Sequence, residues 1–211
     1  QPTEGAVYVN GLEAWKHSSE YVRSIGYVPG EIAFPDLRTG TEFLKSQADF
    51  LGVTDMSYAE YLIKMLQLDP GASLKRMSKG MKQKLGIVTA FMHDPQILIL
   101  DEPTSGQDGK ETKELLALLR QLNQEGITIL LITHDMEIMA SECSRALIMG
   151  NQTVAFDGNP EELFKKSTDE LQDLGLTKPP SVELSLAVPS LGYCKSMDEL
   201  KSKLVAQLSG K

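Results

Sequence analysis

The sequence is poor in cysteine and has no long apolar run, and each shortage disfavours a class of protein. Its 211 residues contain two cysteines, Cys143 and Cys194, which have neither CxxC nor metal-ligand spacing. A disulfide framework and a zinc site are therefore disfavoured, and packing in a reducing, cytoplasmic setting is favoured. No apolar run approaches the roughly 18 to 20 residues that a membrane-spanning helix requires, and nothing at the start resembles a signal peptide.

Basic residues are also scarce relative to acidic ones. Lys and Arg number 21 against 29 Asp and Glu, which gives a formal net charge of -8. A broad nucleic-acid surface needs clustered Lys and Arg, so we expect no nucleic-acid partner, although a small local basic site is compatible with this balance. Hydrophobic residues make up 41% of the chain, which is enough for the core of an ordinary globular domain.

The middle of the chain alternates apolar runs with helical patterns. Residues 96–101 form a nearly continuous apolar run, as expected of a strand buried on both faces in a parallel sheet. A helix is predicted over 109–124, a second buried strand over 127–133, a helix over 136–143 and a strand over 145–149. Strands that alternate with helices in this order predict an α/β fold with a parallel sheet.

The segments before this region predict short strands and then helices. Residues 5–11 and 22–28 are strand candidates that end in turns. From residue 40 to about 92 the apolar period becomes helical, with a capping box predicted at 57–60 and Ser78 opening a further helix.

The region from Gly158 onward differs from the preceding part in its sequence pattern. Residues 159–162 combine an N-cap, a proline and acids, which predicts a helix start, and 177–180 resemble a linker. Residues 182–188 alternate apolar side chains at period two, whereas the preceding prolines favour a helix start, so strand and helix both stay open. Residues 196–199 predict a cap for a final helix with a leucine stripe, formed by Leu200, Leu204 and Leu208.

Two adjacent acids, Asp101 and Glu102, end the first buried strand. Open α/β sheets bind their ligands at the carboxyl ends of their strands. There Asp101 could hold Mg²⁺ and Glu102 could polarise an attacking water. His134 follows the next strand and could lie near the same site. Each feature also has a plain alternative, because a strand can end in solvated acids and a histidine after a strand often serves structural hydrogen bonds.

Ser78, Lys79, Gly80 and Met81 form the start of a predicted helix. An N-cap serine leaves backbone N–H groups facing outward, glycine removes side-chain bulk, and the helix dipole adds partial positive charge, so the segment suits a phosphate. The alternative is a capped surface helix with solvated lysines.

Together these segments resemble the ATP-binding cassette (ABC) ATPase family, in order and in spacing. Residues 77–81 resemble the LSGGQ signature, with Lys79 at its first glycine and Met81 at its glutamine; residues 97–104 resemble the Walker B strand with its catalytic glutamate. Residues 105–108 resemble the D-loop, His134 the switch histidine, and residues 26–29 the approach to the Q-loop. The resemblance covers roughly residues 4 to 165.

The resemblance implies a P-loop NTPase (RecA-like) parallel sheet with an inserted helical subdomain and a small C-terminal extension. The expected divisions are 1–39 (remnant of the β part), 40–93 (helical subdomain), 94–157 (core) and 158–211 (extension). It also implies ATP and Mg²⁺ as cofactors, and two ATP-binding subunits, identical or different, that share each nucleotide. A transmembrane transporter subunit would be the further partner, with the chain peripheral on the cytoplasmic face of the membrane.

The family also implies a role for each matching residue. Asp101 would serve Mg²⁺, Glu102 would activate water and His134 would contact the γ-phosphate. Ser78, Lys79, Gly80 and Met81 would close on the partner's nucleotide, and Asp108 would communicate across the interface.

The chain departs from the family in two respects. The phosphate loop GxxxxGK(S/T) occurs nowhere in the 211 residues; in the family it lies upstream of the region that matches Gly5, so we expect an N-terminal truncation and a chain that is inactive alone. Gly30 stands where the family has its Q-loop glutamine. Glu31 beside it either replaces the glutamine or is a solvated acid.

Different parts of the chain resemble different ABC subfamilies. Residues 28–35 and 78–83 resemble exporters of the ABC-2 type, whereas 102–108 and 171–180 resemble energy-coupling-factor importers. A non-transport ABC ATPase would carry a coiled-coil insertion or a second cassette. A non-enzymatic fragment would offer only its signature helix and docking surface.

Overall fold

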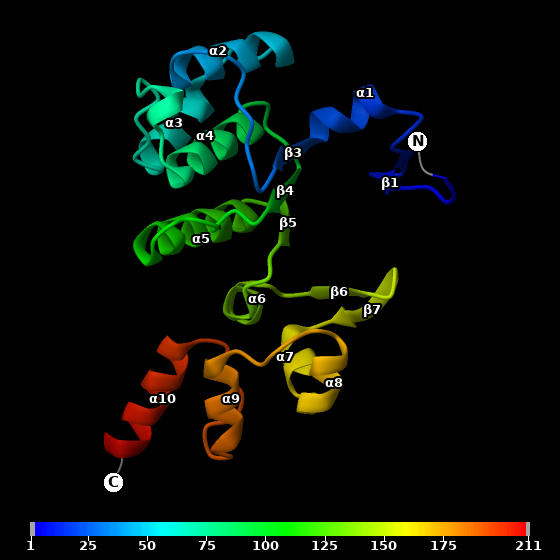
Figure 1. Cartoon of the computed structure of the whole chain (residues 1–211), viewed down its shortest axis with the longest axis vertical. Helices are drawn as coiled ribbons and strands as arrows, with labels where there is room; N and C mark the ends of the chain where they lie inside the picture. The colour runs from blue at the N-terminus through cyan, green and yellow to red at the C-terminus, as the bar shows by residue number, and fades with distance from the viewer. Residues whose placement is uncertain (1–2, 210–211) are drawn as a thin grey trace. The chain divides into compact units, whose positions relative to one another are not determined.

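A computed structural model describes residues 3–209, with the side chains of Ser19 and Glu20 left aside. The chain divides into two compact units, Gln1–Ile132 and Thr133–Lys211. Figure 1 shows the first unit in blue to green and the second in yellow-green to red. The four-part division expected from the sequence stays a prediction.

The first unit contains the predicted parallel sheet. Its strands β3 (Ile25–Val28), β4 (Ile97–Asp101) and β5 (Thr128–Ile132) lie in the order β3-β4-β5, all parallel. The α/β prediction is therefore confirmed. The expectation that the second strand is buried is wrong: Leu130 and Ile132 of β5 are 45% and 48% exposed, because β5 lies at the edge of the sheet and one of its faces is open. In β4 the prediction holds for one face only, since Leu98 and Leu100 are fully buried and their neighbours are half-buried.

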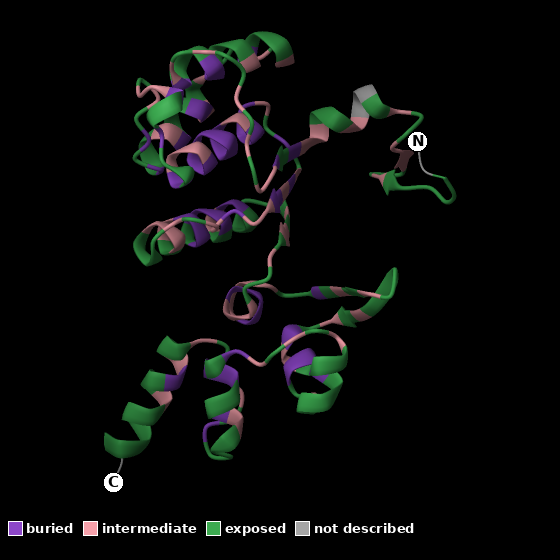
Figure 2. Ribbon diagram, in the orientation of Figure 1, coloured by how far each residue is buried: buried purple, intermediate pink, exposed green. Residues whose placement is uncertain are grey.

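The predicted helical region contains α2 (Gly40–Leu51), α3 (Ser57–Met65), the 3₁₀ helix η2 (Leu74–Arg76) and α4 (Lys79–Phe91). Figure 2 shows α4 as the most continuously buried helix of the first unit. Its fully buried side chains are Leu85, Ile87, Val88 and Phe91. The capping box predicted at 57–60 is wrong, because Met56 is the N-cap of α3 without a side-chain cap. The Asp55 carboxylate accepts from the Ser57 N–H at 2.9 Å instead.

Before the sheet, the chain forms a hairpin of two short strands, β1 (Tyr8–Val9) and β2 (Leu12–Glu13). Asn10 and Gly11 join them with φ of 51° and 81°, conformations that glycine and asparagine adopt most readily. The strand expected over 5–11 is thus much shorter. Helix α1 (Ser18–Tyr21) and the 3₁₀ helix η1 (Val22–Ser24) follow, so the strand expected over 22–28 begins only at Ile25.

Helix α5 (Gly109–Gln124) has the bounds that the sequence predicts. Asp108 caps its N-terminus, and one side of the helix is buried through Leu115, Leu118, Leu119 and Leu122.

The second unit begins with α6 (Met136–Glu142), followed by β6 (Ala146–Gly150) and β7 (Thr153–Gly158). The strand predicted at 145–149 exists, but it pairs antiparallel with β7 in a separate two-stranded sheet and adds no strand to the parallel one. The reason is the turn at Asn151 and Gln152, whose φ values of 49° and 66° fold the chain directly back. Helices α7 (Pro160–Phe164) and α8 (Thr168–Asp173) follow, with Asn159 capping α7 as predicted.

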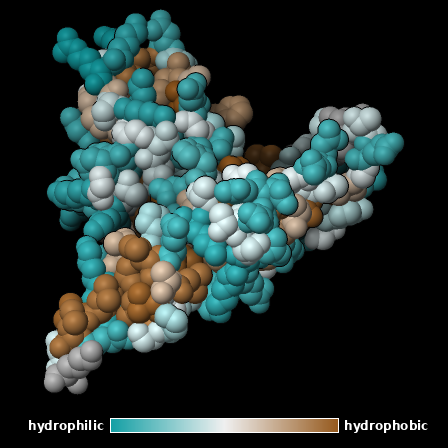
Figure 3. Space-filling view, turned by 60° about the horizontal axis from the view of Figure 1, so that its bottom comes forward, coloured by the Kyte–Doolittle hydropathy of each residue, from teal (hydrophilic) through white to brown (hydrophobic). Residues whose placement is uncertain are grey.

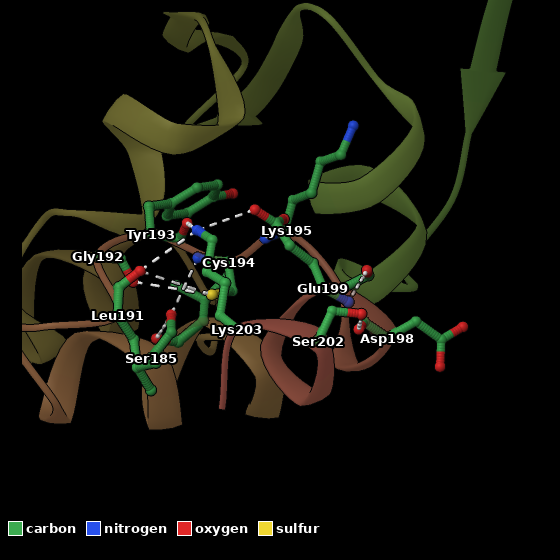
Figure 4. A network of polar contacts seen from close by, with 12 residues as sticks. Ser185, Leu191, Gly192, Tyr193, Cys194, Lys195, Asp198, Glu199, Ser202 and Lys203 are labelled. Atoms are coloured by element: carbon green, nitrogen blue, oxygen red, sulfur yellow. Dashed lines mark hydrogen bonds and ion pairs between the residues drawn. The ribbon is translucent and has the colours of Figure 1, made fainter. Parts of the chain in front are cut away.

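Two further helices complete the second unit, α9 (Pro180–Ala187) and α10 (Met197–Ser209). Residues 182–188, left open between strand and helix, are therefore mostly helical. Lys203 of α10 pairs with Glu199 at 3.0 Å and donates to the carbonyls of Leu191 and Tyr193 at 3.3 and 3.0 Å (Figure 4). These contacts fasten the segment between α9 and α10 onto α10.

The leucine stripe predicted on α10 is buried only at its start. Leu200 is 3% exposed, whereas Leu204 and Leu208 are 38% and 75% exposed. Figure 3 shows apolar side chains gathered in a brown patch at the lower left of the view. Within residues 3–209, no helix combines the length and apolarity that a membrane crossing requires.

Candidate functional site

The acidic pair lies where the sequence predicts it, at the carboxyl end of the central strand. Asp101 is the last residue of β4 and is paired in register with Ile132 of β5. The Glu102 N–H donates to the Ile132 carbonyl at 2.9 Å. Glu102 itself has a φ of 45°, a left-handed conformation that costs a residue with a side chain about 1–3 kcal/mol and persists only where the surrounding structure holds it. This strain was not predictable from the sequence.

Gly30 lies directly beside Asp101. A Cβ added to Gly30 would lie 3.4 Å from an Asp101 carboxylate oxygen and 3.5 Å from its carbonyl oxygen. The register of the parallel sheet explains the proximity. Val28, two residues before Gly30, pairs with Leu100, the residue before Asp101. The adjacent Glu31 is exposed. The structure therefore brings together Asp101 and the Q-loop position, and it is Gly30 that faces the acid.

Gln83 of α4 is a residue that the sequence argument missed. Its side chain is 2% exposed, and its Nε2 donates to the Gly30 carbonyl at 3.1 Å. Its Oε1 is buried and has no hydrogen-bond partner within residues 3–209. The signal was available, because Gln83 lies three residues after Gly80 and four before Ile87, on the buried face of α4.

The signature segment, defined as residues 78–81, opens α4 as predicted. The Ser78 hydroxyl accepts from the Met81 N–H at 3.2 Å, which makes Ser78 the N-cap. A Cβ on Gly80 would lie 2.9 Å from a Glu111 carboxylate oxygen, so glycine leaves room for the Glu111 side chain of α5. Glu111 also pairs with the nearly buried Lys84 at 3.5 Å. The first turns of α4 and α5 are thus in contact.

The D-loop segment, defined as residues 105–108, contacts the signature segment. The Lys79 Nζ donates to the Ser105 Oγ at 2.7 Å. At its end Asp108 accepts from the N–H groups of Glu111 and Lys110, each at 2.8 Å. These two N–H groups, Glu111 first, hold the pKa of the Asp108 carboxyl below its ordinary value.

The end of β4 offers few protein ligands for a Mg²⁺ ion. Within residues 3–209, His, Cys, Asp and Glu form no group of three or more that could hold a metal. Mg²⁺ in phosphate-transfer sites is typically held by one or two carboxylates, with waters and phosphate oxygens as the other ligands. Asp101, a carboxylate at the end of the central strand, fits this mode.

His134 belongs to the second unit. It lies between β5 and α6, two residues after Ile132, and is exposed. Asp135 beside it caps α6 by accepting from the N–H groups of Glu137 and Ile138 at 2.9 and 3.1 Å. The remaining predicted site residues all belong to the first unit.

Comparisons with known proteins bear on this site. The family model described as "ABC transporter" matches residues 1–105. YkoD of Bacillus subtilis, which carries the provisional name of an HMP/thiamine import ATP-binding protein, is 40% identical over 103 residues, or 49% of this chain and 19% of its own length. A provisionally named ABC transporter ATP-binding protein of Methanosarcina mazei is 31% identical over 219 residues, or 98% of this chain and 37% of its own length.

Among solved structures, one described as the structure of an ATP-binding subunit of an ABC transporter matches with a TM-score of 0.72 and 28% identity. The match covers 83% of this chain and 78% of that one. The chain spans 19% and 37% of the length of the two curated relatives.

Proposed function

The chain belongs to the family of ABC transporter ATP-binding proteins, and on that premise we propose that it is part of an ATP-hydrolysing motor that drives solute transport through a membrane partner. The observation that carries the proposal is the end of β4. There Asp101 adjoins the Q-loop position Gly30, and Glu102 has a strained backbone at the point where the strand turns away.

The first unit supplies the residues for phosphoryl chemistry. We assign Asp101 to Mg²⁺, which in such sites neutralises charge that develops on the phosphate oxygens. Glu102 accepts a proton from the attacking water and orients it. The pairing of Asp101 with Ile132 and the hydrogen bond from the Glu102 N–H to the Ile132 carbonyl support this assignment, because they fix the backbone at the two acids.

The remaining residues are assigned by their match to the family. His134 contacts the γ-phosphate. The signature segment closes on the nucleotide of a second ATP-binding subunit, identical or different, with the Ser78 cap at the start of α4 as its supporting feature. Asp108 serves communication between the two subunits. A transmembrane subunit is the further partner, and the chain itself is peripheral on the cytoplasmic face of the membrane.

A second candidate is a non-enzymatic chain that supplies only its signature segment and a docking surface. It is favoured by one observation, the lack of GxxxxGK(S/T) in the 211 residues. Such a loop supplies a nest of backbone N–H groups and a lysine for the phosphates.

Titration calorimetry with Mg-ATP separates the two candidates. We expect the 211-residue chain alone to show no micromolar binding, because the phosphate-binding N–H groups and lysine are not among its residues. A version that carries a GxxxxGK(S/T) loop ahead of residue 1 should bind Mg-ATP and hydrolyse it. Micromolar binding by the 211-residue chain would contradict the expectation, and no hydrolysis by the loop-bearing version would favour the non-enzymatic candidate.

The Q-loop position gives a second test. Because Glu31 is exposed while Gly30 lies against Asp101, we expect Glu31→Ala to keep the Mg-dependent ATPase rate of the loop-bearing version within about twofold, less than 0.5 kcal/mol in the barrier. A loss of about tenfold, roughly 1.4 kcal/mol, that Glu31→Gln restores would show instead that Glu31 replaces the family's glutamine.

A further inference from the structure

The D-loop segment is held at several points along its length. The Ser105 N–H donates to the backbone carbonyl of Glu102 at 3.0 Å, and the Gln107 N–H donates to the backbone carbonyl of Thr104 at 3.1 Å. At its far end Asp108 caps α5. The first half of the segment, Ser105 and Gly106, is contacted by a residue distant in the sequence, the first residue of α4.

That residue is Lys79, whose side chain lies across the loop. Its Nζ donates to the Ser105 Oγ at 2.7 Å. Gly106 has a φ of +75°, and a Cβ added to it would lie 2.7 Å from the Lys79 Cδ and 3.3 Å from the Lys79 Cβ. The absence of a side chain at Gly106 therefore allows the lysine methylenes to pack on the loop backbone, with the ammonium group reaching Ser105.

Helix stability does not explain a lysine at this position. Lys79 is the first residue of α4, and the first turn of α4 contains no acidic residue. The N-terminus of a helix carries partial positive charge, so a cation there is unfavourable for the helix. The contact with Ser105 gives the ammonium group a partner that the helix itself does not provide.

We propose that Lys79 is a positioning residue that holds the D-loop segment against the signature segment, so that the two move together. The proposal rests on the proposed function, since it assigns Lys79 a part in that ATPase. Lys79 acts through the Ser105 hydroxyl and not on the nucleotide. When the signature segment closes on the partner's nucleotide, the coupled D-loop segment moves with it toward the same interface.

A double-mutant cycle in the 211-residue chain tests the contact without any nucleotide. The variants are Lys79→Met, Ser105→Ala and the double mutant, and the measurement is hydrogen exchange of the Ser105 and Gln107 amides, which are hydrogen-bonded within the loop. Each single variant should speed exchange about twofold to tenfold, the range that the net contribution of one hydrogen bond converts to.

The double variant should exchange no faster than the single ones, because each removes the same contact. Lys79→Arg should keep the parent exchange, since it retains a cationic donor. Lys113→Met, which removes an exposed lysine from α5, is the matched control and should also keep it. Unchanged exchange in Lys79→Met, or additive effects in the double variant, would overturn the proposal.

Steady-state ATPase kinetics in the loop-bearing version separate positioning from nucleotide contact. Lys79→Met and Ser105→Ala should lower kcat by a similar factor and leave the KM for ATP unchanged. A raised KM in Lys79→Met but not in Ser105→Ala would place Lys79 on the nucleotide and overturn the proposal. If the loop-bearing parent hydrolyses no ATP, the proposed function fails, while the exchange experiment still decides whether Lys79 holds the D-loop segment.

Discussion

Replacing Glu102 with glutamine should leave Mg-ATP binding intact and reduce ATP turnover by about 10²- to 10⁴-fold, the range that general-base catalysis contributes. The amide keeps the size and hydrogen-bonding shape of the carboxylate and loses its ability to accept the proton of the attacking water. Because the backbone of Glu102 is fixed by its N–H contact with Ile132, the substitution should change chemistry and not position. The measurement is single-turnover hydrolysis in the loop-bearing version, with Mg-ATP affinity measured in parallel.

A matched control removes the same charge elsewhere. Glu60 of α3 is exposed, and Glu60→Gln should hydrolyse ATP like the parent. If Glu102→Gln retains most of the parental rate, Glu102 is a solvated acid at a strand end and the catalytic assignment is wrong. If it loses Mg-ATP affinity as well, Glu102 serves binding and not proton transfer.

Local features of the fold were predictable where one side chain decides them. The Ser78 cap of α4 was predicted from a short polar side chain placed just before a helical period. The Asp108 cap of α5 has the same basis but was not among the predictions. The acids at the end of β4 were found in the same way, because an apolar run that stops at two charges marks the end of a strand.

Features that depend on distant neighbours were not predictable. The apolar run at 127–133 suggested burial, yet Leu130 and Ile132 of β5 are exposed, because a continuous run does not say which face another element covers. The strand at 145–149 was recognised, but its partner is set by the turn at Asn151 and Gln152, which the sequence argument did not identify. Gln83 is a different case: its spacing from Gly80 and Ile87 was available in the sequence, but it was missed because polar residues on helices are usually exposed.

Gly26 belongs to the same group. A glycine inside a strand can mark a bulge, a bend or the close approach of another backbone, and the sequence does not distinguish these. In the structure it marks an approach: a Cβ on Gly26 would fall within 3.0 Å of the Ala90 carbonyl oxygen of α4 and 3.1 Å from the Ala90 carbonyl carbon. On the other side, the Leu98 Cδ1 of β4 would lie 3.2 Å away.

Gly26→Ala should therefore destabilise the chain by about 1–3 kcal/mol, the usual cost of overpacking a close-packed core. The atoms in the way belong to a backbone and to a fully buried side chain, so relief requires α4 to move off β3. Such a loss is a large part of the 5–15 kcal/mol typical of native proteins. Urea unfolding followed by circular dichroism measures it as a lower midpoint.

Gly109→Ala is the control for this measurement. Gly109 is the first residue of α5, and no heavy atom lies within 4 Å of an added Cβ. Alanine there should be neutral or stabilising, because it restricts the unfolded chain and favours the helix. The difference between the two variants then isolates the contact between α4 and β3. If both unfold at the same urea concentration, α4 yields easily at Ala90. The tight packing that places Gln83 of α4 beside Gly30 would then not be a fixed feature of the fold.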